Sequence, residues 1–227
     1  AALGPGVANA VGGVAHAFLD RVPLLLLTDR LSRANLRLAE RHRLEPRRLL
    51  EEVTKDAATI TAPRVDRLLP WAWSKALKAP RGPVHLELPA DEALKPARRH
   101  PGRLEGERPA DPSPSAIRAA ARLLARRGRV VVIAGLGCRA SGAARALQNL
   151  VEHLGSPLLT TPRAKGAVPE DHPLAAGVFV GGPLEEDLLS KAEGVLAVGL
   201  DAVELLPRPW RAGLPVVVLA EYQTGRR

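Results

Sequence analysis

The chain has 227 residues, of which 46% are apolar and 25% charged, a balance typical of a globular protein and not of a disordered one. Its net charge of +9 suggests nucleic-acid binding, but aromatic residues for base stacking make up only 3%, and none lies in the densest arginine cluster, Arg30 to Arg48. A single cysteine excludes a disulfide framework, and no apolar run reaches the ~18 residues of a membrane span. We therefore expect a cytoplasmic protein without a nucleic-acid or membrane partner.

The first half of the chain predicts alternating helices and strands. A glycine-rich turn leads into a helix from Asn9 to Leu19, and the continuously apolar residues 23–28 follow as a buried parallel strand. The arginine cluster is expected to form a long excursion, with a solvated surface or with a phosphorylated or carboxylate ligand. A second helix covers residues 64–78, and a strand at 84–88 is stopped by Pro89.

Residues 93–114 are rich in proline and lack periodicity, which predicts a semi-rigid linker. Beyond it, Ser113 or Ser115 caps a helix that runs to Arg127. Apolar strands are expected at 130–134, 158–160, 195–198 and 216–219, and further helices at 143–154 and 183–192. This alternation predicts an α/β protein with two parallel-sheet lobes and flanking helices.

The segment Gly4-Pro5-Gly6-Val7-Ala8-Asn9 is the most informative motif of the first half. Two glycines allow a backbone to pass close to a ligand, and Pro5 stiffens the turn. The Asn9 amide can both donate and accept, so the turn suits a flat heteroaromatic ligand. An ordinary turn with Asn9 as the helix N-cap explains the same residues.

The motifs of the second half are weaker. Gly135 and Gly137 lack the third glycine of a dinucleotide fingerprint, so they either hold an anion or only pack a helix on a strand. Arg163 and Lys165 follow a strand and either meet a phosphate or are solvated. The run Pro169-Glu170-Asp171-His172-Pro173 has turn chemistry and too few ligands for a metal site.

Cys138 has no local histidine or aspartate partner that would make it reactive, and it is expected in the core. His85 lies within an apolar strand and is expected to be a core histidine and not a base. The sequence offers no set of nucleophile, base and orienting residue. We therefore predict no catalytic residue and no metal ligand within this chain.

Taken together, these strings resemble the thiamine-diphosphate-dependent enzymes of the acetolactate synthase, pyruvate oxidase and benzoylformate decarboxylase superfamily. The resemblance is carried by six parts of the chain. They are, in order, Gly4-Pro5-Gly6-Val7-Ala8-Asn9 with Asp20-Arg21-Val22-Pro23-Leu24, then Val53-Thr54-Lys55, the segment from Gly82 to Asp91, Val132 to Gly137, Ala164-Lys165-Gly166 and Glu170 to Leu174.

The resemblance implies a domain organisation and a binding site. Residues 1–91 would be the later part of the pyrimidine-binding domain, 92–112 the linker, and 113–227 a Rossmann-like central domain that is truncated at its C-terminus. The aminopyrimidine ring would lie against Gly4, Pro5, Gly6 and Asn9. His42 stands where the family often has a glutamine, and a polar contact there is open.

The resemblance also implies a function: part of an enzyme that decarboxylates or ligates a 2-oxo acid, with thiamine diphosphate and Mg²⁺ as cofactors. The family's activating glutamate and its Gly-Asp-Gly metal segment would lie outside this chain, which is therefore expected to be an inactive fragment. A homodimer or homotetramer through the pyrimidine domain is expected. FAD is allowed but not favoured, because Arg163 and Lys165 do not resemble a flavin pocket. The alternatives are a nucleotide- or flavin-binding α/β protein without catalysis, and an interaction module.

Overall fold

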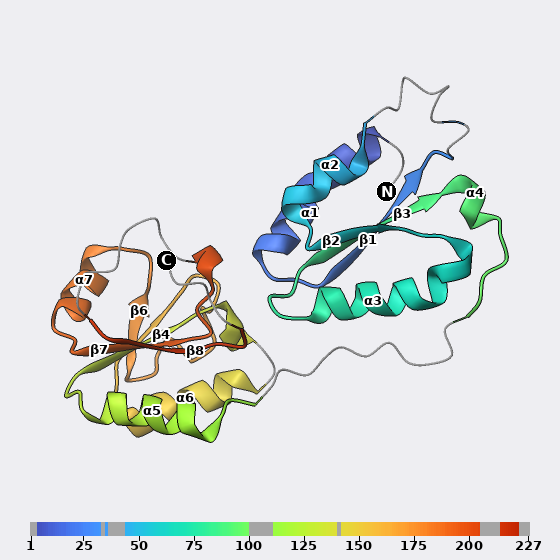
Figure 1. Ribbon diagram of the computed structural model, residues 1–227. Helices are drawn as coiled ribbons and strands as arrows, with labels where there is room; N and C mark the ends of the chain where they lie inside the picture. The colour runs from blue at the N-terminus through green and yellow to red at the C-terminus, as the bar shows by residue number, and fades with distance from the viewer. Residues whose placement is uncertain are drawn as a thin grey trace. The chain divides into compact units, whose positions relative to one another are not determined.

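A computed structural model of the chain describes residues 4–32, 35, 44–99, 111–139, 142–204 and 214–222. The chain divides into two compact units, Ala1–Pro109 and Ala110–Arg227, and each is built around its own parallel sheet (Figure 1). This confirms the predicted α/β class with parallel sheets and flanking helices. Among the described residues, no helix combines the length and the apolar character needed to cross a membrane.

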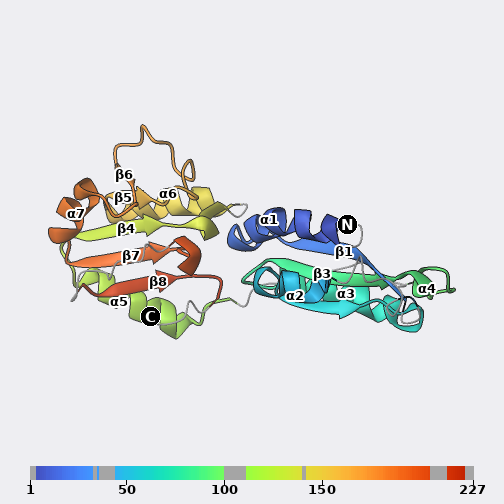
Figure 2. The same ribbon diagram turned by 90° about the horizontal axis from the view of Figure 1, so that it is seen from above.

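The N-terminal unit has a three-stranded sheet in the order β1-β3-β2, with all strands parallel. Its elements are α1 (Pro5–Leu19), β1 (Leu24–Arg30), α2 (Pro46–Leu50), the 3-10 turns Glu51–Val53 and Ala62–Arg64, β2 (Asp56–Thr59), α3 (Val65–Leu77), β3 (Pro83–Pro89) and α4 (Ala90–Ala93). Figure 2 shows β1 beside β3.

Two helical layers cover this sheet (Figure 1). On one face, Leu24 and Leu26 pack against Val7, Val14 and Leu50 of α1 and α2. On the other face, Val84 and Leu86 of β3 pack against α3. Because strand side chains alternate between faces, the side chains of His85 and Glu87 in β3 point to the layer of α1 and α2.

Helix α1 begins at Pro5 and not at Asn9, so the interpretation of Asn9 as an N-cap is wrong. The N-cap is Gly4, whose φ of 58° lies in the region that favours glycine, and its carbonyl accepts hydrogen bonds from Val7 and Ala8. Proline at the first helical position costs no hydrogen bond, since that N–H has no intrahelical partner. Pro5 is therefore the first residue of the helix.

Two glycines in the middle of α1 provide a test of its packing. A Cβ added at Gly12 or Gly13 would meet no atom within 4 Å. Since glycine is less stable than alanine in a helix interior, we expect Gly12→Ala and Gly13→Ala each to raise the free energy of unfolding by about 0.5–1 kcal/mol. Urea titration followed by circular dichroism measures the change. Destabilisation by either substitution would contradict the open environment.

Strand β2 was not predicted from the sequence. It lies between the arginine cluster, which ends at Arg48, and the predicted helix at residues 64–78. Its residues Asp56–Thr59 include two alanines and carry little strand propensity. Strand β2 lies at an edge of the sheet, and its Ala57 backbone is bonded to side chains: the N–H donates to Asp56 Oδ1 at 2.9 Å, and the carbonyl accepts from Arg47 Nη2 at 3.0 Å. Side chains thus cap part of this edge.

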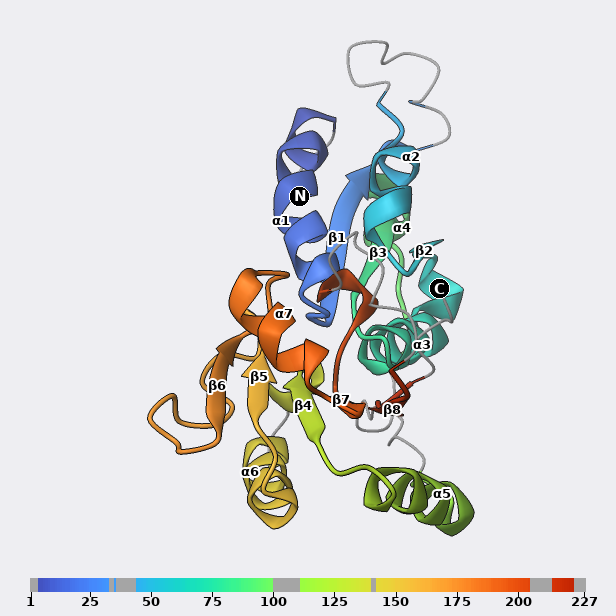
Figure 3. The same cartoon turned by 90° about the vertical axis from the view of Figure 1, so that its left-hand side faces the viewer.

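The C-terminal unit has a five-stranded parallel sheet in the order β6-β5-β4-β7-β8 (Figure 3). Its elements are α5 (Pro114–Ala125), β4 (Val130–Ala134), the 3-10 turn Leu136–Arg139, α6 (Ala143–Leu154), β5 (Leu158–Thr160), β6 (Ala175–Val178), α7 (Pro183–Ser190), β7 (Gly194–Val198), the 3-10 turn Ala202–Glu204 and β8 (Val216–Leu219). Helices α5 and α6 pack on one face, and α7 packs on the other. The sequence missed the short, largely exposed strand β6.

Candidate functional site

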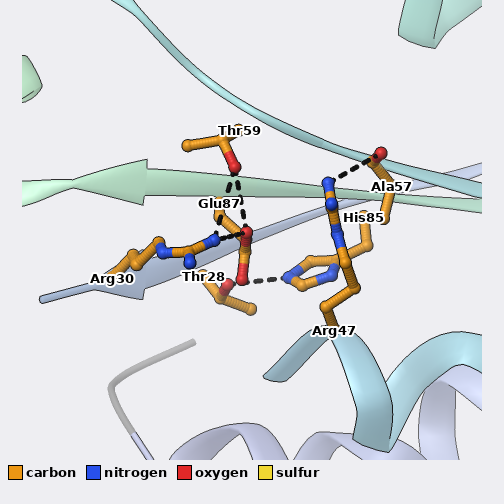
Figure 4. Close-up of polar contacts among 7 residues, drawn as sticks. All are labelled: Thr28, Arg30, Arg47, Ala57, Thr59, His85 and Glu87. Carbon is orange, nitrogen blue, oxygen red and sulfur yellow. Dashed lines mark hydrogen bonds and ion pairs between the residues drawn. The ribbon is translucent and has the colours of Figure 1, made fainter. Parts of the chain in front are cut away.

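A cluster of polar side chains lies on the face of the N-terminal sheet that α1 and α2 cover, near the carboxyl ends of the strands (Figure 4). It brings together Thr28 and Arg30 of β1, Thr59 of β2, and His85 and Glu87 of β3. The parallel register explains this meeting, because Glu87 lies opposite Thr28 on one side and opposite Thr59 on the other. In open α/β sheets, ligands bind at the carboxyl ends of the strands.

Glu87 is the centre of the cluster. Its side chain is fully buried, and Oε2 accepts hydrogen bonds from Arg30 Nη1 and, at 3.1 Å, from Thr59 Oγ1. Its other oxygen, Oε1, has no hydrogen-bond partner in the described part of the chain. A buried carboxylate needs a nearby cation, and Arg30, with a side chain 30% exposed, supplies that charge.

His85 is fully buried beside Glu87, as expected for a core histidine, but only half of its hydrogen-bonding capacity is used. Nε2 lies 2.8 Å from Thr28 Oγ1, whereas Nδ1 has no partner among the described residues. Burial lowers the pKa of His85 below its ordinary 6.5, Glu87 opposes this shift, and Arg47 and Arg30 reinforce it. Figure 4 shows the ring between Glu87 and Arg47.

A histidine that is kept neutral in the folded state makes stability depend on pH. The unfolded chain binds a proton at His85 below about pH 6.5, whereas the folded protein does so only at lower pH, so stability is lost as pH falls through this window. We expect the unfolding temperature to drop between pH 7.5 and 5.5, and His85→Leu to reduce this drop. Equal slopes in wild type and His85→Leu would contradict the assignment.

An open groove of about 820 Å³ adjoins the cluster. It is lined by Arg30, Glu45, Arg47, Arg48, Glu51, Thr54, Lys55, Asp56 and Ala57. Part of the arginine-rich segment therefore lines a concave surface. Burial and the neighbouring cations Lys75, Arg21 and Lys78 lower the pKa of Lys55 to about 8.

The predicted ring-binding residues lie at the same end of the N-terminal unit. Helix α1 returns into β1 through a short connection and runs antiparallel to it, so its first turn lies toward the carboxyl ends of the strands (Figure 1). Gly4, Pro5 and Gly6 form this turn, and Asn9 is exposed on the next one. His42 lies outside the described residues.

In the C-terminal unit, the loops after β4 and β7 lie at the point where the strand order reverses, the usual ligand crevice of such sheets. These loops are in direct contact. Gly135 N–H donates to the Val198 carbonyl and Gly137 N–H to the Gly199 carbonyl, both at 2.8 Å. A Cβ on Gly135 would come within 2.5 Å of Leu200 Cα. Glycine is thus required here for close packing of two loops.

Glu204 connects the segments that meet at this crevice. Its Oε2 accepts hydrogen bonds from Leu136 N–H at 2.8 Å and Asp201 N–H at 3.0 Å, and its Oε1 accepts one from the buried hydroxyl of Thr161. The backbone N–H groups that could have held an anion are therefore already bonded within the chain. Of the two explanations for Gly135 and Gly137, these contacts favour packing.

The other candidate residues of this unit have ordinary structural roles. Cys138 is buried, its thiol donates to the Val198 carbonyl at 3.3 Å, and burial raises its pKa to about 11. Lys165 pairs with Glu170 at 3.2 Å on the surface, and His172 with Glu152 at 3.1 Å. The described residues hold no group of three or more side chains suited to a metal ion.

Thr28, Thr59 and Glu87 were not predicted as site residues, and Arg30 was considered only as part of the arginine cluster. The sequence nevertheless carries a signal for Glu87. In the strand Val84-His85-Leu86-Glu87-Leu88, polar and apolar residues alternate, which places two ionisable side chains on one face. No comparable signal marked Glu204, because its partners Leu136 and Thr161 lie 68 and 43 residues away in the sequence.

Comparison with known proteins gives consistent results for both units. Residues 117–212 match the model of the thiamine pyrophosphate enzyme central domain. A probable 2-ketoarginine decarboxylase of Pseudomonas aeruginosa is 32% identical over 221 residues, which cover 94% of this chain and 38% of that protein. A probable acetolactate synthase large subunit of Methanocaldococcus jannaschii is 33% identical over 183 residues, 77% of this chain and 31% of that protein. The chain thus spans about a third of the length of these relatives.

Proposed function

The chain belongs to the superfamily of thiamine-diphosphate-dependent enzymes, and on this basis we propose that it forms part of an enzyme that decarboxylates or ligates a 2-oxo acid. The observation that carries the proposal is the similarity to the 2-ketoarginine decarboxylase, which extends over 94% of the chain and so includes both units. Residues 1–91 would form part of the pyrimidine-binding domain, 92–112 the linker and 113–227 the central domain.

The first two turns of α1 fit the aminopyrimidine of thiamine diphosphate. Gly4 is the N-cap of the helix and has a positive φ, and the exposed amide of Asn9 has no partner among the described residues. The proposed binding residues are Gly4, Pro5, Gly6, Asn9 and His42. When bound, the cofactor would supply carbanion stabilisation, and the protein would supply orientation. The diphosphate and Mg²⁺ would be held by residues other than those described here.

The test uses the complete polypeptide that carries these residues, purified and supplied with thiamine diphosphate and Mg²⁺. We expect turnover of pyruvate or of another 2-oxo acid, and weaker cofactor binding by calorimetry in Asn9→Ala. The exposed Asn149 of α6 provides the matched control, because Asn149→Ala should leave binding unchanged. Absence of turnover across a panel of 2-oxo acids would contradict the proposed function. Equal cofactor affinity in both variants would contradict the role of Asn9.

The 227-residue chain by itself is proposed to be inactive, and the complete protein is proposed to be a homodimer or homotetramer assembled through the pyrimidine domain. Release of CO₂ from any 2-oxo acid by the isolated chain would overturn the first statement. Sedimentation of the complete protein as a monomer would overturn the second.

We also propose that the central domain binds no FAD at the crevice between β4 and β7. The Glu204 carboxylate and the Val198 and Gly199 carbonyls already accept the hydrogen bonds of the glycine loop, which supports this view. The same contacts weigh against the alternative of a nucleotide- or flavin-binding protein without catalysis. The visible absorbance spectrum of a flavin in the purified complete protein would contradict the proposal.

A further inference from the structure

Arg30, at the end of β1, uses only part of its hydrogen-bond donors within the described part of the chain. Its Nη1 donates to Glu87 Oε2 and, at 3.4 Å, to Thr59 Oγ1, whereas its Nε and Nη2 have no partner among the residues that the structure describes. A guanidinium carries five N–H groups in a planar fork. One edge of this fork therefore remains available, on a side chain that is 30% exposed and lines the groove.

The hydrogen bond to Glu87 fixes the orientation of the Arg30 guanidinium. Glu87 is fully buried on the central strand β3, and Thr59 holds the same carboxylate oxygen at 3.1 Å (Figure 4). The guanidinium is thus fixed before any ligand arrives, which lowers the entropy cost of binding. Arg30 is the last residue of β1, at the edge where parallel sheets bind ligands.

The charges around the groove favour an anion at the Arg30 end. Four cations and three carboxylates line it, and one of these carboxylates, Asp56, pairs with Lys75 at 3.2 Å. Arg47 lies on the other side of His85 from Glu87, and its Nη2 is already bonded to the Ala57 carbonyl (Figure 4). Arg47 can therefore add to the positive potential, while Arg30 offers the free pair of donors.

We propose that the free edge of the Arg30 guanidinium binds the carboxylate of the 2-oxo acid substrate, and that Glu87 is the residue that positions it. The identity of the ligand rests on the proposed function. Two parallel N–H groups match the two oxygens of a carboxylate, a geometry that a lysine cannot reproduce. The site would thus recognise the part of the substrate that all 2-oxo acids share.

The first test observes Arg30 directly in the 227-residue chain. The arginine Nε–Hε signals are recorded by NMR during titration with pyruvate, and the Arg30 signal is assigned from its loss in Arg30→Lys. We expect a saturable shift of this signal with pyruvate and none with methyl pyruvate, which lacks the charge. An equal shift of all exposed arginines, or an equal response to sulfate, would overturn the assignment.

The second test uses the complete polypeptide with thiamine diphosphate and Mg²⁺. Because removing Arg30 alone would leave Glu87 as a buried charge, the variant is Arg30→Met combined with Glu87→Leu. We expect the KM for pyruvate to rise about tenfold or more, with kcat changed by less than about threefold, because a charge-assisted hydrogen bond is worth one to two powers of ten in affinity. The KM of Arg30→Lys should lie between those of wild type and the double variant. The KM of Arg64→Met, a change at an exposed arginine, should equal that of wild type.

The outcomes separate the two proposals. An unchanged KM in the double variant of an active enzyme would overturn the Arg30 site and leave the proposed function standing. A wild-type enzyme without turnover of any 2-oxo acid would overturn the proposed function, while the NMR titration would still show whether Arg30 binds a carboxylate. A fall in kcat without a rise in KM would also overturn the binding role.

Discussion

Replacing Arg30 by methionine is expected to destabilise the N-terminal unit by about 3–5 kcal/mol, because it leaves the fully buried Glu87 carboxylate without its cation. Replacing Glu87 by leucine should cost less, since the Arg30 side chain is already 30% exposed and can move into solvent. The pair is thus asymmetric: loss of the cation costs more than loss of the anion.

The double variant makes this asymmetry measurable. Arg30→Met with Glu87→Leu removes both charges, and we expect its stability to lie within about 1 kcal/mol of wild type, as for other buried pairs replaced by apolar residues. Urea unfolding followed by tryptophan fluorescence reports on this unit through Trp71 and Trp73 of α3 when Trp210 is replaced by phenylalanine. Equal losses in the two single variants would show that Arg30 does not neutralise Glu87.

Alanine at Gly135 or Gly199 is expected to destabilise the C-terminal unit by about 3 kcal/mol or more. A Cβ at Gly135 would lie 2.5 Å from Leu200 Cα and 2.6 Å from the Gly199 carbonyl oxygen, and these backbone atoms cannot move aside without separating β4 from β7. At Gly199, a Cβ would lie 2.8 Å from Gly137 Cα, and the φ of 59° adds strain for any other residue.

Gly194 provides the matched control in the same unit. It lies in β7, and a Cβ there would make only ordinary contacts, the nearest at 3.5 Å from Arg127. Gly194→Ala should therefore be neutral or stabilise by up to about 1 kcal/mol. Urea unfolding of the single variants, followed by circular dichroism, measures the change. A neutral Gly135→Ala would mean that the two loops are not in contact in solution.

The extent to which the sequence predicts this fold differs between its elements. The strands at 130–134 and 195–198 are confirmed, because buried parallel strands are continuously apolar. Strands β2 and β6 were missed, since their sequences, Asp-Ala-Ala-Thr and Ala-Ala-Gly-Val, have little strand propensity. They belong to the sheets through pairing with distant strands, which local propensity does not encode.

The candidate site shows the same division. The Gly4–Asn9 motif could be recognised from its residues, although the start of its helix was placed too late. The cluster of Arg30, Thr59 and Glu87 depends on which strands are neighbours and in what register, and the order β1-β3-β2 is not the order of the sequence. A contact between residues 57 positions apart, such as that of Arg30 with Glu87, therefore could not be predicted from the sequence alone.

The side chains that cap Ala57 limit the extension of the N-terminal sheet beyond β2. Because Asp56 and Arg47 occupy the Ala57 N–H and carbonyl, an incoming strand cannot form a continuous ladder with β2 without displacing both. One arginine on a five-residue helix thereby limits the ways in which the sheet can be extended or can aggregate.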